Sequence, residues 1–182
     1  LDSLYKTAEH KSFIKKEQYK TLSFDKEIDR ITSHFRNSGV YHFSQDYVYF
    51  KMDSIGRDHK ISVDLQIKDR LVRKQDSAYR IPFKIYNVKD VNIFTDNSYE
   101  KRNMDITDSV KYNNYNLYSI GKLRFKPKAL TDAIFILPNS PFKDINRTRS
   151  YRHLSNLRTF KYPNIEYLEN PDSTLTANIY LT

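Results

Sequence analysis

The same order of hydrophobic patterns occurs twice along the 182 residues, and this repeat constrains the fold more than any other feature. The first half reads as helix, helix, strand, turn and strand. The second half reads as strand, helix, helix, strand, turn and strand. Such a repeat indicates two copies of one small α+β module rather than a single large core. We predict a first module at residues 1–72 and a second at residues 79–182, each a small mixed sheet with two helices on one face.

The clearest helix is predicted at residues 23–37. Its apolar side chains are spaced by four, three and four residues, which places one stripe along the helix: Phe24, Ile28, Ile31 and Phe35. Ser23 is a candidate N-cap, and Asp25 and Glu27 suit the positive end of the helix dipole. Gly39 follows the stripe, where a left-handed residue commonly ends a helix.

A shorter helix and two strands complete the first half. Residues 1–14 carry loosely spaced apolar side chains and predict a helix. Apolar and polar side chains alternate at residues 47–53 and again, without interruption, at residues 60–68. Gly56 and Asp58 lie between them, as the turn of a hairpin requires. The apolar face of this hairpin is expected to pack on the helical stripe.

The middle of the chain is more polar. Residues 70–80 are charged and predict a linker. Residues 79–94 are rich in β-branched and aromatic side chains and predict a strand, whose alternation breaks at Lys89 and Asp90, as at a β-bulge. Residues 95–116 predict a polar surface insertion, and residues 117–125 return to strand character.

Two helices and a hairpin are predicted at the end of the chain. Pro127 opens a short helix, and Asp144 begins a second one. The second helix is expected to bury one face, made of Tyr151, Leu154 and Leu157. Residues 165–169 predict a strand and residues 170–173 a turn. The last strand has alternating apolar side chains: Leu175, Ala177, Ile179 and Leu181.

The composition excludes several functional classes. No cysteine is present, which rules out disulfides, thiolate catalysis and zinc ribbons. Only three glycines occur, so a glycine-rich phosphate loop cannot be built. The five histidines fall at no metal-ligand spacing, and no nucleophile motif such as G-x-S-x-G occurs. We therefore expect no enzymatic activity, no cofactor and no metal.

The net charge of +9 favours contact with an acidic partner. With 15 tyrosines as stacking surfaces, a basic nucleic-acid-binding α+β protein is one alternative interpretation. The sequence lacks the aromatic–Gly–aromatic motif of RNA-recognition sheets and the G-x-x-G loop of KH domains. Protein binding is therefore the favoured function.

Local motifs agree with the repeat. Residues 10–15 are similar to the end of a first helix. Residues 24–31 and 35–43 are similar to a second helix after which the chain continues through a small residue, a glycine and an aromatic residue. Residues 127–130 and 151–157 are similar to the two helices of a second copy. In this order and these motifs the chain resembles POTRA domains, the periplasmic modules of the outer-membrane assembly family that includes BamA and TamA. Within this family, the motifs are most similar to those of TamL, the lipoprotein relative of Bacteroidota.

The resemblance has two departures and several implications. The second helix of the second copy ends without a glycine, and the insertion at residues 95–116 is unusual for a POTRA domain. By comparison with the second copy, the first copy lacks its opening strand. The resemblance implies modules at the periplasmic face of the outer membrane of a Gram-negative bacterium, with a membrane β-barrel expected after Thr182. Implied partners are unfolded or β-rich outer-membrane client proteins and periplasmic accessory subunits.

In POTRA architecture the first strand of each hairpin lies at a sheet edge, which implies a mechanism. An edge strand can accept an extended peptide through backbone hydrogen bonds, with little demand on side chains. The resemblance therefore points to two sets of candidate protein-binding residues: Tyr47, Tyr49, Phe50 and Lys51, and Ile165, Glu166, Tyr167 and Leu168. A third interpretation, in which the modules are rigid periplasmic spacers that bind no client, stays open.

Overall fold

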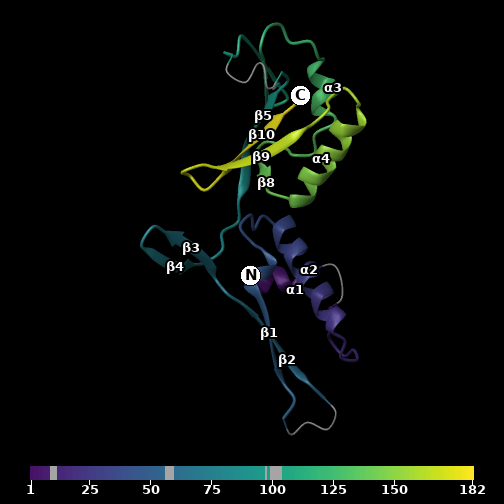
Figure 1. Ribbon diagram of the computed structural model, residues 1–182, viewed down its shortest axis with the longest axis vertical. Helices are drawn as coiled ribbons and strands as arrows, with labels where there is room; N and C mark the ends of the chain where they lie inside the picture. The colour runs from purple at the N-terminus through teal and green to yellow at the C-terminus, as the bar shows by residue number, and fades with distance from the viewer. Residues whose placement is uncertain (9–11, 56–59, 97, 99–103) are drawn as a thin grey trace. The chain divides into compact units, whose positions relative to one another are not determined.

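The computed structural model describes residues 1–8, 12–55, 60–96, 98 and 104–182. The chain divides into two compact units, Leu1–Lys84 and Ile85–Thr182 (Figure 1). Each unit combines helices with small β-sheets, so the fold is α+β, as predicted. The predicted hairpin turn at Gly56 and Asp58 lies outside the described residues.

The described residues of the first unit form two helices, a 3-10 turn and two separate hairpins. Its elements are α1 (Asp2–Lys6), α2 (Thr21–Asn37), η1 (Gln45–Tyr47), β1 (Val48–Asp53), β2 (Ser62–Ile67), β3 (Arg70–Lys74) and β4 (Ser77–Ile81). Strands β1 and β2 pair antiparallel from Val48 opposite Ile67 to Asp53 opposite Ser62, which confirms the predicted hairpin. Strands β3 and β4 form a second two-stranded sheet.

The core of the first unit lies between α2 and the β1–β2 hairpin. Five side chains are buried there: Ile31, Phe35, Val40, Phe43 and Val48. The predicted stripe therefore faces the core, with Phe24 and Ile28 half-buried at its margin. Gly39 has a φ of 96°, so it holds the left-handed conformation expected after the helix.

Three predictions for the first unit are wrong. The helix predicted at residues 1–14 is short, because α1 ends at Lys6. Ser23 lies inside α2, which begins at Thr21 after the extended residue Lys20, so Ser23 is not its N-cap. The predicted linker at residues 70–80 is the β3–β4 hairpin. Its charged side chains do not alternate with apolar ones in the way that predicts a strand, because a ribbon exposed on both sides needs no apolar face.

The second unit is built on one larger mixed sheet. Its elements are β5 (Asn87–Phe94), β6 (Asp108–Tyr112), β7 (Tyr115–Ser119), α3 (Pro127–Thr131), β8 (Ser140–Pro141), α4 (Asp144–Asn156), β9 (Asn164–Glu169) and β10 (Leu175–Tyr180). The strand order is β6-β7-β5-β10-β9, and β8 pairs with the start of β5. Strand β5 is parallel to both β7 and β10, whereas the two outer pairs are antiparallel.

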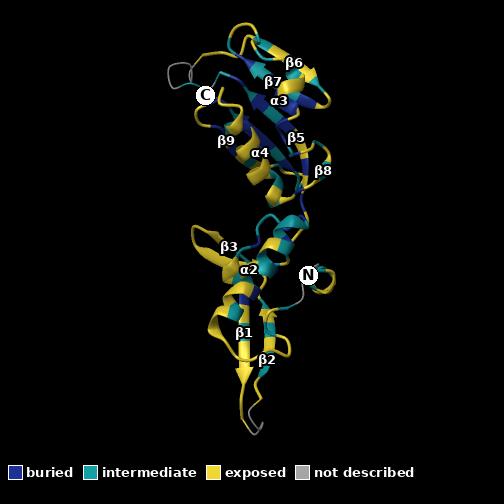
Figure 2. Ribbon diagram, turned by 90° about the vertical axis from the view of Figure 1, so that its right-hand side faces the viewer, coloured by how far each residue is buried: buried dark blue, intermediate teal, exposed yellow. Residues whose placement is uncertain are grey.

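Helices α3 and α4 cover one face of this sheet (Figures 1 and 2). Buried apolar side chains come from the helices, their connections and alternate positions of the strands: Val91, Ile93, Leu117, Leu130, Ile136, Phe142, Leu154, Ile165, Leu175, Ala177, Ile179 and Leu181. The alternation predicted for the last strand is therefore confirmed. The predicted irregularity is confirmed too, because Val88 and Asp90 pair with consecutive residues of β10 and Lys89 bulges out.

Other predictions for the second unit need correction. Residues 79–94 form two strands, since β4 ends at Ile81 and β5 begins at Asn87. The polar segment 95–116 contains β6 and the start of β7, joined by a tight turn at Asn113 and Asn114. Both asparagines have positive φ, as a type I′ hairpin turn requires. The strand predicted at residues 117–125 ends at Ser119.

The buried face of α4 also differs from the predicted one. Leu154 is fully buried, but Tyr151 and Leu157 are exposed. Ser150 takes the buried position instead, and its hydroxyl accepts a hydrogen bond from the backbone N–H of Phe135 at 2.8 Å. A polar group at this point ties α4 to the segment after α3, which an apolar stripe could not do.

Candidate protein-binding strand edges

The first predicted set of residues lies around β1. Tyr47 belongs to η1 rather than to the strand, and its half-buried ring packs edge-on against Phe83 at a centroid distance of 4.9 Å. Phe50 is half-buried against Phe24, with ring centroids 5.1 Å apart. Tyr49 and Lys51 are exposed. The structure therefore places Tyr47 and Phe50 in packing positions and Tyr49 and Lys51 at the surface.

Strand β1 has only β2 beside it in the described part of the chain, so its other edge is open. The backbone of Lys68 donates to the carbonyl of Tyr47 at 3.0 Å, directly opposite in register. Hydrogen-bonded pairs alternate along an antiparallel ladder, so Tyr49 and Lys51 also point their N–H groups toward β2. The N–H groups of Phe50 and Met52 consequently point toward the open edge.

The side chain of Tyr49 is held on the hairpin. The ammonium of Lys68 lies 3.8 Å from the centroid of the Tyr49 ring, a cation–π contact between neighbouring strands. The ring remains accessible on its outer side, since Tyr49 is 42% exposed. The surface beside the open edge therefore combines an aromatic ring with positive charge.

The second predicted set lies on β9, which ends the strand order of the larger sheet. Ile165 is buried, and Tyr167 packs edge-on against Phe142 with centroids 5.2 Å apart. Glu166 and Leu168 point to the opposite, helix-free face and are exposed. This edge thus has two side chains that anchor the strand and two that a bound peptide could contact.

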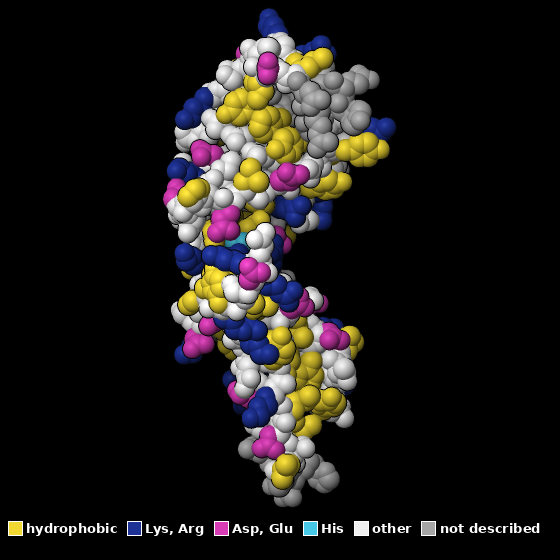
Figure 3. All heavy atoms as spheres, turned by 60° about the vertical axis from the view of Figure 1, so that its left-hand side comes forward, with side chains coloured by type: hydrophobic (Ala, Val, Ile, Leu, Met, Phe, Trp, Pro, Cys, Tyr) yellow, Lys and Arg dark blue, Asp and Glu magenta, His cyan; other side chains and the backbone are white. Residues whose placement is uncertain are grey.

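The helix-free face of the sheet carries an aromatic row that the sequence did not reveal. Tyr118, Phe94 and Tyr180 lie opposite one another on β7, β5 and β10. Phe94 stacks on Tyr118 at 5.2 Å and on Tyr180 at 5.0 Å, so its ring is covered on both faces. Figure 3 shows hydrophobic side chains gathered on the second unit.

An amide row runs beside the aromatic row on the same face. Asn116 donates to Asn92 at 3.0 Å, and Asn92 donates to Asn178 at 2.9 Å. Lys111 and Glu166 continue this row on the outer strands β6 and β9. The row therefore runs from a cation on one edge strand to a carboxylate on the other, through three amides.

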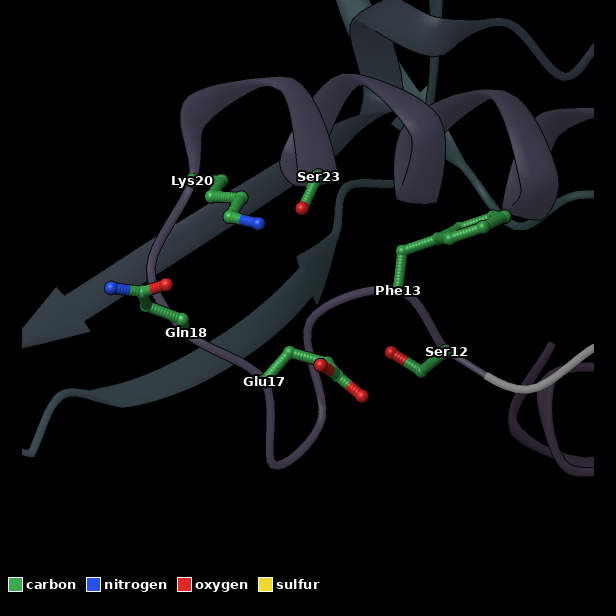
Figure 4. A pocket seen from close by; sticks show the side chains of 6 residues that line it. All are labelled: Ser12, Phe13, Glu17, Gln18, Lys20 and Ser23. Carbon is green, nitrogen blue, oxygen red and sulfur yellow. The ribbon is translucent and has the colours of Figure 1, made fainter.

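A shallow pocket lies in the first unit, between residues 12–20 and the start of α2 (Figure 4). It has a volume of about 470 Å³ and is lined by Ser12, Phe13, Glu17, Gln18, Lys20 and Ser23. The hydroxyl of Ser12 accepts a hydrogen bond from the backbone of Ile14 at 3.3 Å, which gives it a structural role. Among the described residues that line the pocket there is no histidine that could activate a serine.

Two other kinds of feature are absent from the described ranges. No group of three or more His, Asp or Glu side chains is arranged to hold a metal ion. No helix in this part of the chain combines the length and the apolar character needed to cross a membrane.

Comparison with solved structures identifies the fold. The crystal structure of BamA from Haemophilus ducreyi lacking POTRA domains 1–3 matches all of this chain, with a TM-score of 0.58 and 9% identity. BamA POTRA3-5 from Haemophilus influenzae matches 88% of the chain and 80% of that structure, at 8% identity and a TM-score of 0.31. The N-terminal domain of Omp85 from Thermosynechococcus elongatus matches all of the chain and 91% of that structure, at 8% identity and a TM-score of 0.29.

The first of these matches carries the conclusion that the fold is of the POTRA and BamA type, as the resemblance in the sequence implied. The chain spans 26% of the length of that BamA structure. No protein-family model matches the sequence, and no curated protein sequence matches it significantly.

Proposed function

We propose that this chain is a protein-binding part of an outer-membrane assembly protein and works at the periplasmic face of the outer membrane. Its clients are unfolded or β-rich outer-membrane proteins, and its modules also dock accessory subunits. The observation that carries the proposal is the open edge of β1, in a fold of the BamA type. The proposed subfamily is that of TamL.

Strand addition is the proposed binding mode. The open edges of β1 and β9 offer backbone groups that an extended client can pair with, and this pairing requires no particular client sequence. The exposed side chains of Tyr49, Lys51, Glu166 and Leu168 lie where they would contact the added strand. Nucleic-acid binding gains no such support, since the ring of Phe94 is already stacked on both faces.

The hydrogen-bond direction in β1 decides how the edge should be tested. Tyr49→Pro would remove a donor that faces β2 and would damage the hairpin itself. Met52→Pro removes a donor on the open edge instead, and the Met52 side chain is half exposed. Met52→Ala is the matched control, because it shortens the same side chain but keeps the N–H group.

We expect Met52→Pro to weaken binding of an unfolded outer-membrane polypeptide by about tenfold, since one backbone hydrogen bond is lost and the ring obstructs the edge. Met52→Ala should bind like the wild type. Affinity is measured by fluorescence anisotropy, and circular dichroism verifies that both variants are folded. Equal affinity of the two variants would exclude the edge of β1 as the client-binding site. If neither the wild type nor either variant bound the polypeptide, the rigid-spacer interpretation would be favoured.

A further inference from the structure

The β3–β4 hairpin is a ribbon that stands apart from the other sheet of the first unit (Figure 1). Arg70 lies opposite Ile81 and Lys74 opposite Ser77, with Gln75 and Asp76 forming the turn. No third strand joins it in the described part of the chain, so both of its long edges are open. An isolated two-stranded ribbon is only marginally stable in water, and an added strand would stabilise it.

The ribbon is strongly basic. Four cations lie within Arg70–Ile81, against the single carboxylate of Asp76, which leaves a net charge of +3: Arg70, Arg73, Lys74 and Arg80. None of the four takes part in an ion pair with a described residue. Arg80 donates to the carbonyl of Asp69 at 2.7 Å and the ammonium of Lys74 lies 5.8 Å from the Tyr79 ring, and neither contact neutralises the positive charge. The charge is therefore available to an acidic partner.

The cations are divided equally between the two faces of the ribbon. Side chains alternate along each strand, and residues directly opposite in register share a face. Arg70 and Lys74 consequently lie on one face, together with Val72, Tyr79 and Ile81. Arg73 and Arg80 lie on the other face, together with Leu71 and Ala78.

This division distinguishes between two kinds of acidic partner. A flat anionic surface such as a lipid bilayer can touch only one face of a ribbon and would leave two cations unused. An extended acidic segment that adds to an open edge lies in the plane of the ribbon and directs successive side chains to both faces. Its carboxylates can then reach cations on both faces while its backbone completes a three-stranded sheet.

We propose that the β3–β4 ribbon docks an extended, acidic segment of another protein by strand addition. Ribbon edges provide the backbone hydrogen bonds, and Arg70, Lys74, Arg73 and Arg80 select for negative charge on both faces. This surface is made of strands other than β1 and β9, so the proposal holds whether or not the edges of those strands bind clients.

The test uses the whole chain and two labelled peptides, Val-Glu-Glu-Val-Glu-Glu-Val and the same peptide with Gln at each Glu position. We expect the acidic peptide to bind and the neutral peptide to bind at least tenfold more weakly. Binding of the acidic peptide should weaken as salt is raised, because the contacts are exposed charges. Equal affinity for the two peptides would overturn the proposal.

Charge-reversal variants test the role of each face. Arg73→Glu with Arg80→Glu alters one face, and Arg70→Glu with Lys74→Glu alters the other. Each pair should weaken acidic-peptide binding by about tenfold or more, since two exposed ion pairs are replaced by repulsion. The control is Lys122→Glu with Lys126→Glu, which makes the same change of charge at exposed sites of the second unit and should leave affinity within about twofold.

Vesicles of phosphatidylglycerol provide the competing outcome. Tight vesicle binding that only one face's variant abolishes, without peptide binding, would show a lipid contact and overturn the proposal. Amide hydrogen exchange gives a measurement that does not depend on how the variants fold. The acidic peptide should slow exchange in β3 and β4 of the wild-type protein, and unchanged exchange there at saturating peptide would also overturn it.

Discussion

Glu27 is a fully buried carboxylate that joins two segments of the first unit. Its oxygens accept hydrogen bonds from the guanidinium of Arg30, at 3.0 and 2.6 Å, and from the backbone N–H of Phe13 at 2.9 Å. Residues around Phe13 are thereby attached to α2. The sequence suggested only a favourable position near the helix start, because a glutamate on a helix is ordinarily solvated.

The environment of Glu27 makes stability depend on pH. Burial alone would raise the pKa of Glu27, but the hydrogen bonds from Arg30 and Phe13 and the charge of Arg30 outweigh it, so the pKa lies below its usual value. A lowered pKa in the folded state stabilises the protein above the unfolded pKa of about 4.3. This stabilisation is lost as the pH falls through the lower, folded pKa.

We expect Glu27→Gln to lower the free energy of unfolding at pH 7 by about 3 kcal/mol, because the charge of Arg30 loses the buried carboxylate that compensates it. The effect should shrink at acidic pH, where the wild-type carboxylate is itself protonated. Urea unfolding at several pH values measures both effects. Asp25→Asn, on the exposed side of the same helix, is the control and should change stability by less than about 0.5 kcal/mol.

Arg158 follows α4 and has a φ of 53°. This left-handed conformation is the one that Gly39 holds after α2, so the second unit keeps the geometry of the glycine exit without the glycine. We expect Arg158→Gly to raise the free energy of unfolding by up to about 1 kcal/mol, because glycine has no Cβ to strain. A lower thermal midpoint than that of the wild type would contradict this prediction.

Among the elements, the helices and strands with a clear apolar period were predicted from the sequence, whereas two hairpins were missed. Apolar and polar side chains alternate along β2, β9 and β10, because one face of each strand packs against other residues. This alternation can be recognised in the sequence. The β3–β4 ribbon buries no face, and β6 carries mainly polar side chains at an edge. Pairing across strands, rather than burial, forms these elements, and a sequence pattern does not report such pairing.

The candidate edges were proposed from the resemblance to POTRA architecture, but the rows on the helix-free face were not predicted. Asn92, Asn116 and Asn178 are far apart in the sequence, and only the strand register brings them together. The same holds for Phe94, Tyr118 and Tyr180. Because a one-residue slip would move each of these side chains to the other face, no reasoning without the register could find them.

We expect Asn92→Ala to destabilise the second unit by about 1–3 kcal/mol, since it removes the central amide and leaves the groups of Asn116 and Asn178 that it bonded without their partner. Asn87→Ala, at an exposed position of the same strand, provides the control and should be nearly neutral. Chemical unfolding followed by tyrosine fluorescence reports both variants. Equal stability of the two variants would show that water replaces the lost amide at no cost.

At the scale of the whole molecule, the two units differ in how their sheets are protected. Strands β5, β7 and β10 are paired on both sides, whereas each strand of the first unit has one partner in the described residues. Local opening exposes backbone groups most readily where pairing and burial are least. We therefore expect amide exchange to be slowest for Val91, Ile93, Ala177 and Ile179, and fastest in the β3–β4 ribbon.

Hydrogen exchange followed by mass spectrometry of peptic fragments measures this order on the intact chain. A uniform exchange rate across both units would contradict the prediction and would indicate that the chain opens as a single cooperative body. The net charge of +9 does not bear on this order, since it governs association rather than local opening.

The parallel pairing of β5 with β10 places the first and last long strands of the second unit side by side. A chain that is synthesised from its N-terminal end exposes β5 long before β10 is present, so the position between β5 and β9 in the sheet stays vacant until β10 is made. During that interval the open edge of β5 presents unpaired backbone groups to other extended segments. Correct assembly of this unit therefore depends on the late pairing of β10 with β5. Protection of the β5 edge before that pairing raises the yield of folded protein.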